Sequence, residues 1–477
     1  MKTLRRFRQS PARMCTLWIA LCFLLTSAAY MSWVYRLMAL LGGEATDWLS
    51  MGAGYLAQAA GLGLTTLALN KRPEADHRRW FTLALPAFAL CAIPALLGGT
   101  APGVVVFGLL MNLLCGVIAG YYLFALAAMV PASRRSVAFG VGYGIATIAL
   151  GLLALVVSGD FLRGGGALWA YVPLALALAL WAGRLPAPRC TDSVEPQKPL
   201  AKRELVMACA TALLLSLIKN LGFGFPTVDI EMGLKPELSR LLYAVGLIAA
   251  GFINDKSRKN GAVCTAAALA LPFIMLGLAG EALSSAICWG LDYLFFGFFS
   301  VYRAVLFLDI AARTRRWELA PVGLLFGRLG DASGTALCKL LTDSKIALVA
   351  LTAALFMVAV FLFFRLIQLI YEPAAARQKS EREVFEGFAM QHDLSVREQE
   401  VLRLVLARRS NGEIAEALFV SASTVKFHMH NLLQKTGCKN RNDLLRKYAA
   451  ALYPHMEGVE VPPIPSNEPQ PADATGM

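Results

Sequence analysis

Ionisable side chains interrupt long apolar stretches in the second half of the chain. Asp292, Arg328 and Asp331 each lie about ten residues from an end of their stretch, and at a rise of about 1.5 Å per residue this depth is near the centre of a bilayer. Arg328 and Asp331 share a helix face through their i, i+3 spacing. A charge in the membrane interior is costly. These residues therefore form either a structural ion pair or triad, or part of a cavity that binds a small polar ligand.

A second group of chemically active side chains lies near the C-terminus. Lys426, Phe427 and His430 share one face of a predicted helix, whereas Val425 and Leu432 lie on the opposite, apolar face. A helix with this division packs one face on a core and presents the other to a partner.

Patterns typical of enzymes and metal sites are missing from the sequence. It has no Gly-rich phosphate loop, no Ser/His/Asp arrangement and no Cys-x-x-Cys pair, and its ten cysteines are scattered, mostly in apolar stretches. We therefore expect no catalytic residues, no metal and no cofactor.

The composition indicates a membrane protein. Of the 477 residues 57% are hydrophobic and only 16% are charged, against about 25% charged in soluble domains. This excludes a soluble enzyme and a disordered chain. A spanning helix needs about 20 apolar residues. Twelve such stretches are found, at about 16–40, 48–69, 80–98, 103–130, 137–158, 167–183, 204–224, 238–254, 261–279, 282–309, 319–338 and 345–371.

The distribution of basic residues predicts the topology. With the N-terminus and every second connection on the cytoplasmic side, those segments hold 22 Lys and Arg residues, whereas the other connections hold 5. Positive residues favour the cytoplasmic side. Twelve spans therefore place both termini in the cytoplasm.

The membrane region divides into two sets of six spans. The connection 184–203 contains four prolines and separates halves at about 1–183 and 204–371. Gly251, Asp255, Lys256 and Lys259 match the G-x-x-x-D-R/K-x-x-R/K loop of major facilitator superfamily transporters, although the corresponding loop in the first half lacks the Gly and Asp. The region resembles that family, which implies a bundle of twelve helices.

The segment after residue 371 predicts a small helical domain. Residues 372–393 are interpreted as a linker, and the Pro-rich residues 451–477 as a disordered tail. Between them, Ser395 with Glu398 and Ser410 with Glu413 form two predicted capping boxes. Ser421 caps a third helix that ends at Gly437, and Asn440 starts a fourth. The short connection between the second and third helices is typical of a helix-turn-helix.

Residues 394–450 resemble the LuxR-type helix-turn-helix domain of bacterial transcription regulators. The matching residues are Leu394, Ser395, Arg397, Glu398, Glu400, Val401, Leu402, Ser410, Asn411, Glu413, Ile414, Ala415, Leu418, Ser421, Thr424, Val425, Lys426, His428, Asn431, Lys435, Gly437, Asn440 and Arg441. Two positions differ: Arg408 stands where the family usually has Gly, and Gly412 where it often has Lys or Arg.

The resemblance implies binding of double-stranded DNA by the third helix. It makes Lys426, Phe427 and His430 the expected contacts to base edges. The expected phosphate contacts are Asn411, Thr424, Lys435 and Arg441. The domain holds ten Lys and Arg against five Asp and Glu, as phosphate binding requires. The alternatives are that the domain docks proteins, that Phe427 packs on a partner, or that Lys435 and Arg441 are solvated charges.

The favoured hypothesis is a membrane-embedded, one-component transcription regulator whose membrane region senses a small molecule. The expected fold is all-α, with a polytopic bundle followed by the small cytoplasmic domain. The resemblance to bacterial regulators implies the inner membrane of a bacterial cell as the location. Expected partners are DNA, the lipid bilayer, an unidentified ligand, a second copy through the fourth helix and, as a further candidate, RNA polymerase. The alternative is a membrane transporter with an attached regulatory domain.

Overall fold

A computed structural model describes residues 11–73, 75–156, 165–184, 201–221, 236–268, 282–341, 344–370 and 372–452. Within these ranges the ordered elements are helical, which confirms the predicted all-α class. The chain divides into two compact units, residues 1–370 and 371–477. The predicted disordered tail and the proline-rich connection lie almost entirely outside the described residues.

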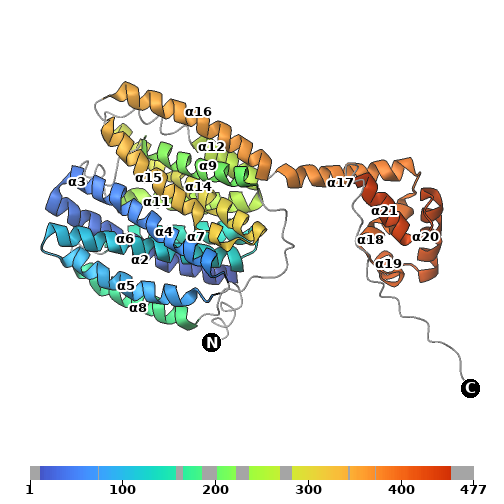
Figure 1. The fold of residues 1–477 in the computed structure, drawn as a ribbon, viewed down its shortest axis with the longest axis horizontal. Helices are drawn as coiled ribbons and strands as arrows, with labels where there is room; N and C mark the ends of the chain where they lie inside the picture. The colour runs from blue at the N-terminus through green and yellow to red at the C-terminus, as the bar shows by residue number, and fades with distance from the viewer. Residues whose placement is uncertain are drawn as a thin grey trace, which may run out of the picture. The chain divides into compact units, whose positions relative to one another are not determined.

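The first unit is a helical bundle (Figure 1). Its first half contains α2 (Pro11–Leu41), α3 (Gly43–Asp47), the π-helix η1 (Trp48–Gly54), α4 (Tyr55–Lys71), α5 (Arg78–Leu97), α6 (Ala101–Met129), α7 (Ala132–Val156), η2 (Gly165–Ala167) and α8 (Leu168–Arg184). Its second half contains α9 (Lys202–Leu221), α11 (Pro236–Lys256), α12 (Arg258–Ala268), α14 (Ala282–Thr314), η3 (Trp317–Leu319), α15 (Val322–Leu340) and α16 (Lys345–Ile370).

Helices occupy the described parts of all twelve predicted apolar stretches. Seven of the described helices, α2, α5, α6, α7, α9, α14 and α16, are long and apolar enough to cross a membrane, and α8 is a shorter apolar helix. These helices support a polytopic membrane protein. The count of twelve spans remains a prediction.

The main contacts between the halves are made by two helix pairs. Helix α7 packs against α11, and α4 packs against α15. The α7–α11 contact is close: a Cβ added at Gly140 would lie 2.3 Å from the carbonyl oxygen of Leu247. Glycine is therefore required at this crossing, where small residues let two membrane helices approach.

The described part of the second unit contains five helices: α17 (Glu372–Gln391), α18 (Val396–Leu406), α19 (Asn411–Leu418), α20 (Ala422–Thr436) and α21 (Arg441–Leu452). The last four correspond to the predicted helices. The interpretation of 372–393 as a linker needs correction, because this segment is mostly helical. Phe385 and Phe388 of α17 are buried in the core of the unit, against Tyr448 of α21.

The predicted N-caps are confirmed. Both capping boxes are complete, at Ser395 with Glu398 and at Ser410 with Glu413, and the Ser421 hydroxyl accepts a hydrogen bond from the Thr424 amide. These caps satisfy amide donors that the first helical turn leaves without partners.

Helices α17 to α20 all end in the same way. The chain turns through a residue with positive φ, at Asp393, Arg408, Phe419 and Gly437, and in each case the following amide donates to a carbonyl five residues earlier. This is the Schellman arrangement, which favours glycine. Only Gly437 satisfies that preference, so Arg408 occupies a left-handed position at the point where the family usually has Gly.

Replacing Arg408 with glycine should stabilise the second unit by about 1 kcal/mol, because it removes the cost of a left-handed side chain. Slower hydrogen exchange of the core amides of α18 and α20 in the intact chain would report the gain. Arg409→Gly is the matched control, since Arg409 has no positive φ, and equal stabilisation by both changes would contradict this explanation.

Candidate functional site

Helices α19 and α20 form a tight helix-turn-helix. Phe419 adopts φ 54°, its amide donates to the Glu416 carbonyl, and the Val420 amide donates to the Ala415 carbonyl. Ser421 then caps α20 directly. The turn therefore fixes the second helix against the first.

Helix α20 has one buried and one exposed face, as predicted. Val425, Met429 and Leu432 are buried in the core. Lys426 and His430 are exposed on the other side, and Phe427 is 61% exposed. A cation, an aromatic ring and an imidazole thus share one accessible helix face.

The predicted phosphate contacts have different environments. Asn411, the first residue of α19, is half-buried. Thr424 lies in the first turn of α20, with its hydroxyl 2.7 Å from the Ser421 hydroxyl. Both therefore lie at a helix N-terminus, where backbone dipoles favour an anion.

Lys435 has an intramolecular role that the sequence analysis did not predict. Its Nζ donates to the Asp393 carbonyl oxygen at 2.8 Å and to Glu398 Oε2 at 2.9 Å. Burial of Glu398 favours its neutral form, but the hydrogen bonds from Lys435 and Ser395 outweigh burial and hold the pKa of Glu398 below its ordinary value of 4.5. The pair thus joins α18, which holds Glu398, to the end of α20, which holds Lys435.

The Lys435–Glu398 pair should make the second unit less stable in acid. Because the folded-state pKa of Glu398 is lowered, its contribution is present above 4.5 and is lost as the pH falls through the lowered pKa. Glu398→Gln should cost about 1 kcal/mol at neutral pH, since Lys435 remains partly solvated, and should reduce the acid sensitivity. Hydrogen exchange measured from neutral pH to below 4.5 checks this, with the exposed Glu400→Gln as control. Equal effects of both changes would contradict it.

Arg441 also bonds within the domain. Its Nη2 donates to the carbonyl oxygens of Arg409 and Val405, which ties the start of α21 to the end of α18. Part of its donor capacity is therefore used in holding the domain together.

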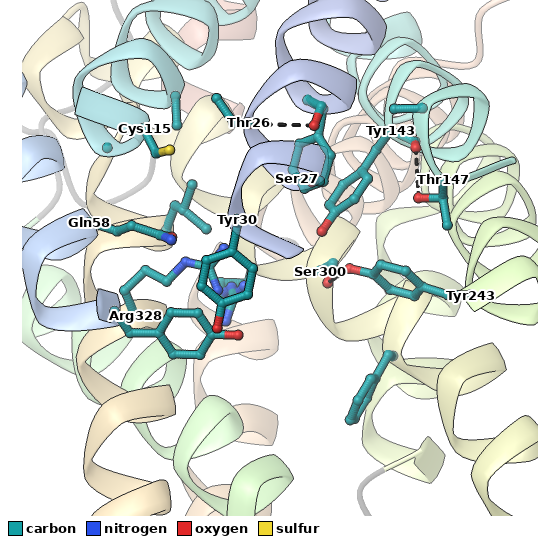
Figure 2. Close-up of a pocket in the computed structure, with 18 of the residues that line it drawn as sticks. Thr26, Ser27, Tyr30, Gln58, Cys115, Tyr143, Thr147, Tyr243, Ser300 and Arg328 are labelled. Carbon is teal, nitrogen blue, oxygen red and sulfur yellow. Dashed lines mark hydrogen bonds between the residues drawn. The ribbon is translucent and has the colours of Figure 1, made fainter. Parts of the chain in front are cut away.

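A cavity of about 180 Å³ lies between the two halves of the membrane unit. Figure 2 shows Arg328, Tyr30 and Gln58 around one part of it and Tyr143 and Tyr243 around another. Six tyrosines line it: Tyr30, Tyr55, Tyr122, Tyr143, Tyr243 and Tyr293.

Arg328 and Asp331 belong to an ion cluster beside this cavity. Asp331 is fully buried and lies 3.0 Å from Lys219 Nζ, 3.3 Å from Arg328 Nη1 and 3.7 Å from Arg303 Nη1. Arg328 lines the cavity, whereas Asp331 lies behind it. The side chain of Asp292 lies outside the described part of the structure. Arg328 therefore belongs both to an ion cluster with Asp331 and to the wall of the cavity.

Sequence reasoning left Lys219 and Arg303 out of the site. Both interrupt apolar helices, but their convergence depends on how α9, α14 and α15 pack. Tyr293 of α14 also lines the cavity. Trp33 and Tyr302 have other contacts: Trp33 donates its indole N–H to the Val104 carbonyl, and Tyr302 packs on Phe363.

A second ion network joins the halves where α7 begins. The Asp255 carboxylate accepts hydrogen bonds from the amides of Ser136 and Val137 at 3.0 and 2.8 Å. Arg258 and Arg135 both bind Asp309, at 2.7 and 2.9 Å. The Asp of the family-like loop therefore binds two backbone amides near the start of a helix in the other half.

At the opposite end of the unit, Lys339 of α15 lies 2.7 Å from Asp47 of α3. Asp47 follows the end of α2, and the start of α2 lies beside α7 near Gly142. Ion pairs thus connect the halves at both ends of the cavity.

Asp255→Asn should accelerate exchange of the Ser136 and Val137 amides roughly tenfold or more, because a charge-assisted hydrogen bond is weakened in a partly buried site. Hydrogen exchange with mass spectrometry on the detergent-solubilised chain checks this. Asp76→Asn is the control, since Asp76 pairs with Arg78 within its own segment. Unchanged protection at the start of α7 would contradict a link between the halves.

In the described part of the chain, no group of three or more His, Cys, Asp or Glu side chains could hold a metal ion.

Residues 392–448 match the family described as bacterial regulatory proteins, luxR family. The CsgBAC operon transcriptional regulatory protein of Escherichia coli is 44% identical over 61 residues, which are 11% of this chain and 28% of that protein. The spore germination protein GerE of Bacillus subtilis is 43% identical over 49 residues, 10% of this chain and 66% of that protein. The chain spans about a quarter of the length of the first of these relatives.

The structural similarity lies with transporters. The human organic anion transporter MFSD10 aligns with a TM-score of 0.54 and 15% identity, over 74% of this chain and 99% of that one. The xylose transporter XylE from E. coli, in a partially occluded inward-open conformation, aligns with a TM-score of 0.52 and 13% identity, over 76% and 98%. At these identities the similarity shows the fold alone.

Proposed function

We propose that this chain, which joins a membrane domain of major facilitator superfamily fold to a LuxR-family helix-turn-helix domain, is a membrane-embedded transcription regulator that binds double-stranded DNA. The observation that carries the proposal is the exposed face of α20 in a domain whose residues match that family. The match to regulators covers a small part of the chain, so the activity of the whole protein rests on this face and on the membrane unit together.

In this proposal α20 enters the major groove, which admits one α-helix. Lys426 donates to guanine O6 or N7, Phe427 contacts a thymine methyl group, and His430 reaches a neighbouring base edge. Asn411 and Thr424 hold phosphates at helix N-termini. Lys435 and Arg441 contribute positive charge while keeping their intramolecular bonds.

Two copies pair through α21, so that two α20 helices read half-sites about one helical turn apart. RNA polymerase is the further partner proposed for a regulator of this family. The excess of basic residues in the predicted cytoplasmic connections supports an inner-membrane protein with both termini in the cytoplasm.

The membrane unit is the proposed sensor. Its halves meet through ion pairs at both ends of a cavity, so a change in the packing of the halves would have to alter these pairs. A ligand shifts the equilibrium only if it binds one arrangement more tightly than the other. We infer that this shift changes the pairing or the accessibility of the DNA-binding domain.

Selection of genomic DNA fragments by the full chain in lipid nanodiscs tests the function. The intact protein should enrich discrete fragments, and a variant lacking residues 372–452 should enrich none. Equal enrichment by the shortened membrane unit would contradict the assignment. Absence of enrichment by the intact chain, together with substrate uptake by the same preparation in liposomes, would favour the transporter alternative.

A further inference from the structure

The cavity of the membrane unit has a surplus of positive charge. Lys219, Arg303 and Arg328 line it, and no Asp or Glu is among the described lining residues. The carboxylate that faces these three cations is that of Asp331, within 3.0 to 3.7 Å. Among the described side chains, one carboxylate balances one of the three charges, which leaves two positive charges in excess in a site where uncompensated charge is costly.

Two guanidinium donors in this cluster lack a partner among the described residues. Arg303 Nε and Arg328 Nε are buried and make no hydrogen bond there. Arg303 is only 6% exposed, although one of its terminal nitrogens donates to the Ser216 hydroxyl. A buried donor without an acceptor costs free energy. An anionic group in the cavity, beside these two arginines, would supply part of the missing negative charge.

Aromatic side chains hold the cations and form flat walls. The Arg328 guanidinium lies 4.4 Å from the centre of the Tyr55 ring, and Lys219 Nζ lies 4.9 Å from that of Phe296. Hydroxyl groups are also present, with Tyr243 and Ser300 oxygens 2.6 Å apart (Figure 2). The cavity volume of about 180 Å³ leaves room for a small organic molecule. The site therefore suits a small molecule with a planar apolar body.

We propose that the cavity binds a small organic carboxylate. Arg328 and Arg303 hold the carboxylate through their guanidinium groups, which match its geometry, Lys219 adds charge, and the tyrosine walls hold the apolar body. This proposal rests on the sensing role proposed above and names the ligand class. Arg328 of α15 contacts Tyr55 of α4, so a carboxylate bound to Arg328 acts where the two halves meet.

The test uses the detergent-solubilised full chain, without DNA. Benzoate, 4-hydroxybenzoate and phenylacetate are titrated against thermal unfolding, each beside its neutral amide, with benzylammonium as a cation of similar size. The carboxylates should raise the unfolding midpoint in a concentration-dependent way, whereas the amides and the cation should not. Equal stabilisation by amides, or no stabilisation by any carboxylate, would overturn the proposal without any variant.

Arg328→Gln and Arg303→Gln should each weaken carboxylate binding about tenfold or more. The control is Arg313→Gln, which lies on α14 outside the cavity lining. Circular dichroism shows whether each variant is folded, and unchanged carboxylate affinity in folded Arg328→Gln would overturn the assignment. Because no DNA is present, failure here removes the ligand class and leaves the DNA-binding proposal standing.

Discussion

Replacing Lys426 and His430 together with alanine should weaken specific DNA binding by the intact chain on the order of 100-fold, because each base contact contributes about 1–3 kcal/mol. Both side chains are exposed on α20, whereas the residues that hold this helix in the core lie on its other face. The double change should therefore leave the fold of the domain intact.

Fluorescence anisotropy on a selected DNA fragment, measured over a range of salt concentrations, checks this expectation. Arg382→Ala is the control: it removes an exposed cation that pairs with Glu386 on α17. The control should keep nearly full affinity. Unchanged affinity in the double variant, or an equal loss in the control, would show that α20 does not read DNA.

Asp331→Ala should destabilise the membrane unit by about 3–5 kcal/mol, because it leaves buried cations without their partner. The carboxylate is fully buried and holds Lys219, Arg303 and Arg328. Its backbone carbonyl also accepts the Asn220 side-chain amide at 2.7 Å, an interaction that the substitution keeps. The loss would therefore report the carboxylate itself.

Thermal unfolding in detergent measures this change. Adding Lys219→Met to Asp331→Ala should recover part of the lost stability, because it removes one of the unpaired cations. The two residues are in contact, so the effects of the two changes should not be additive. Asp76→Ala, in an ion pair at about 30% exposure, should cost less than 1 kcal/mol. Native stability of Asp331→Ala would contradict the view that this carboxylate organises the cluster.

The helix-turn-helix could be predicted from the sequence because its signals are local. Ser395, Ser410 and Ser421 determine helix starts through hydrogen bonds that span three residues. The spacing of Val425 and Leu432 is also a local signal, because it shows which face of α20 packs on the core. Arg408 stands where the family usually has glycine, and its positive φ of 60° is a conformation that favours glycine.

The role of α17 could not be predicted in this way. The segment 372–393 has a mixed, polar composition typical of a linker. Phe385 and Phe388 are buried in a core that includes Tyr448, about sixty residues later in the sequence. The bonds of Lys435 and Arg441 could not be predicted for the same reason, because their partners lie 37 and 32 residues away in the sequence.

The membrane cavity was only partly predictable. Depth in an apolar stretch identified Arg328 and Asp331, and their spacing placed them on one face. Lys219 and Arg303 join them only through the packing of three helices. The loop at Gly251 and Asp255 indicated the fold, but the contact of Asp255 with the backbone near the start of α7 is visible only in the structure.

Genome-wide DNA occupancy of the intact, membrane-bound protein in its native cell tests the central claim most directly. The Lys426→Ala/His430→Ala variant and the Arg382→Ala variant are measured in parallel. We predict discrete occupied sites for the native chain and for Arg382→Ala, and the loss of those sites in the double variant. Absence of enriched sites under several growth conditions, or the same sites in the double variant, would contradict a membrane-embedded transcription regulator.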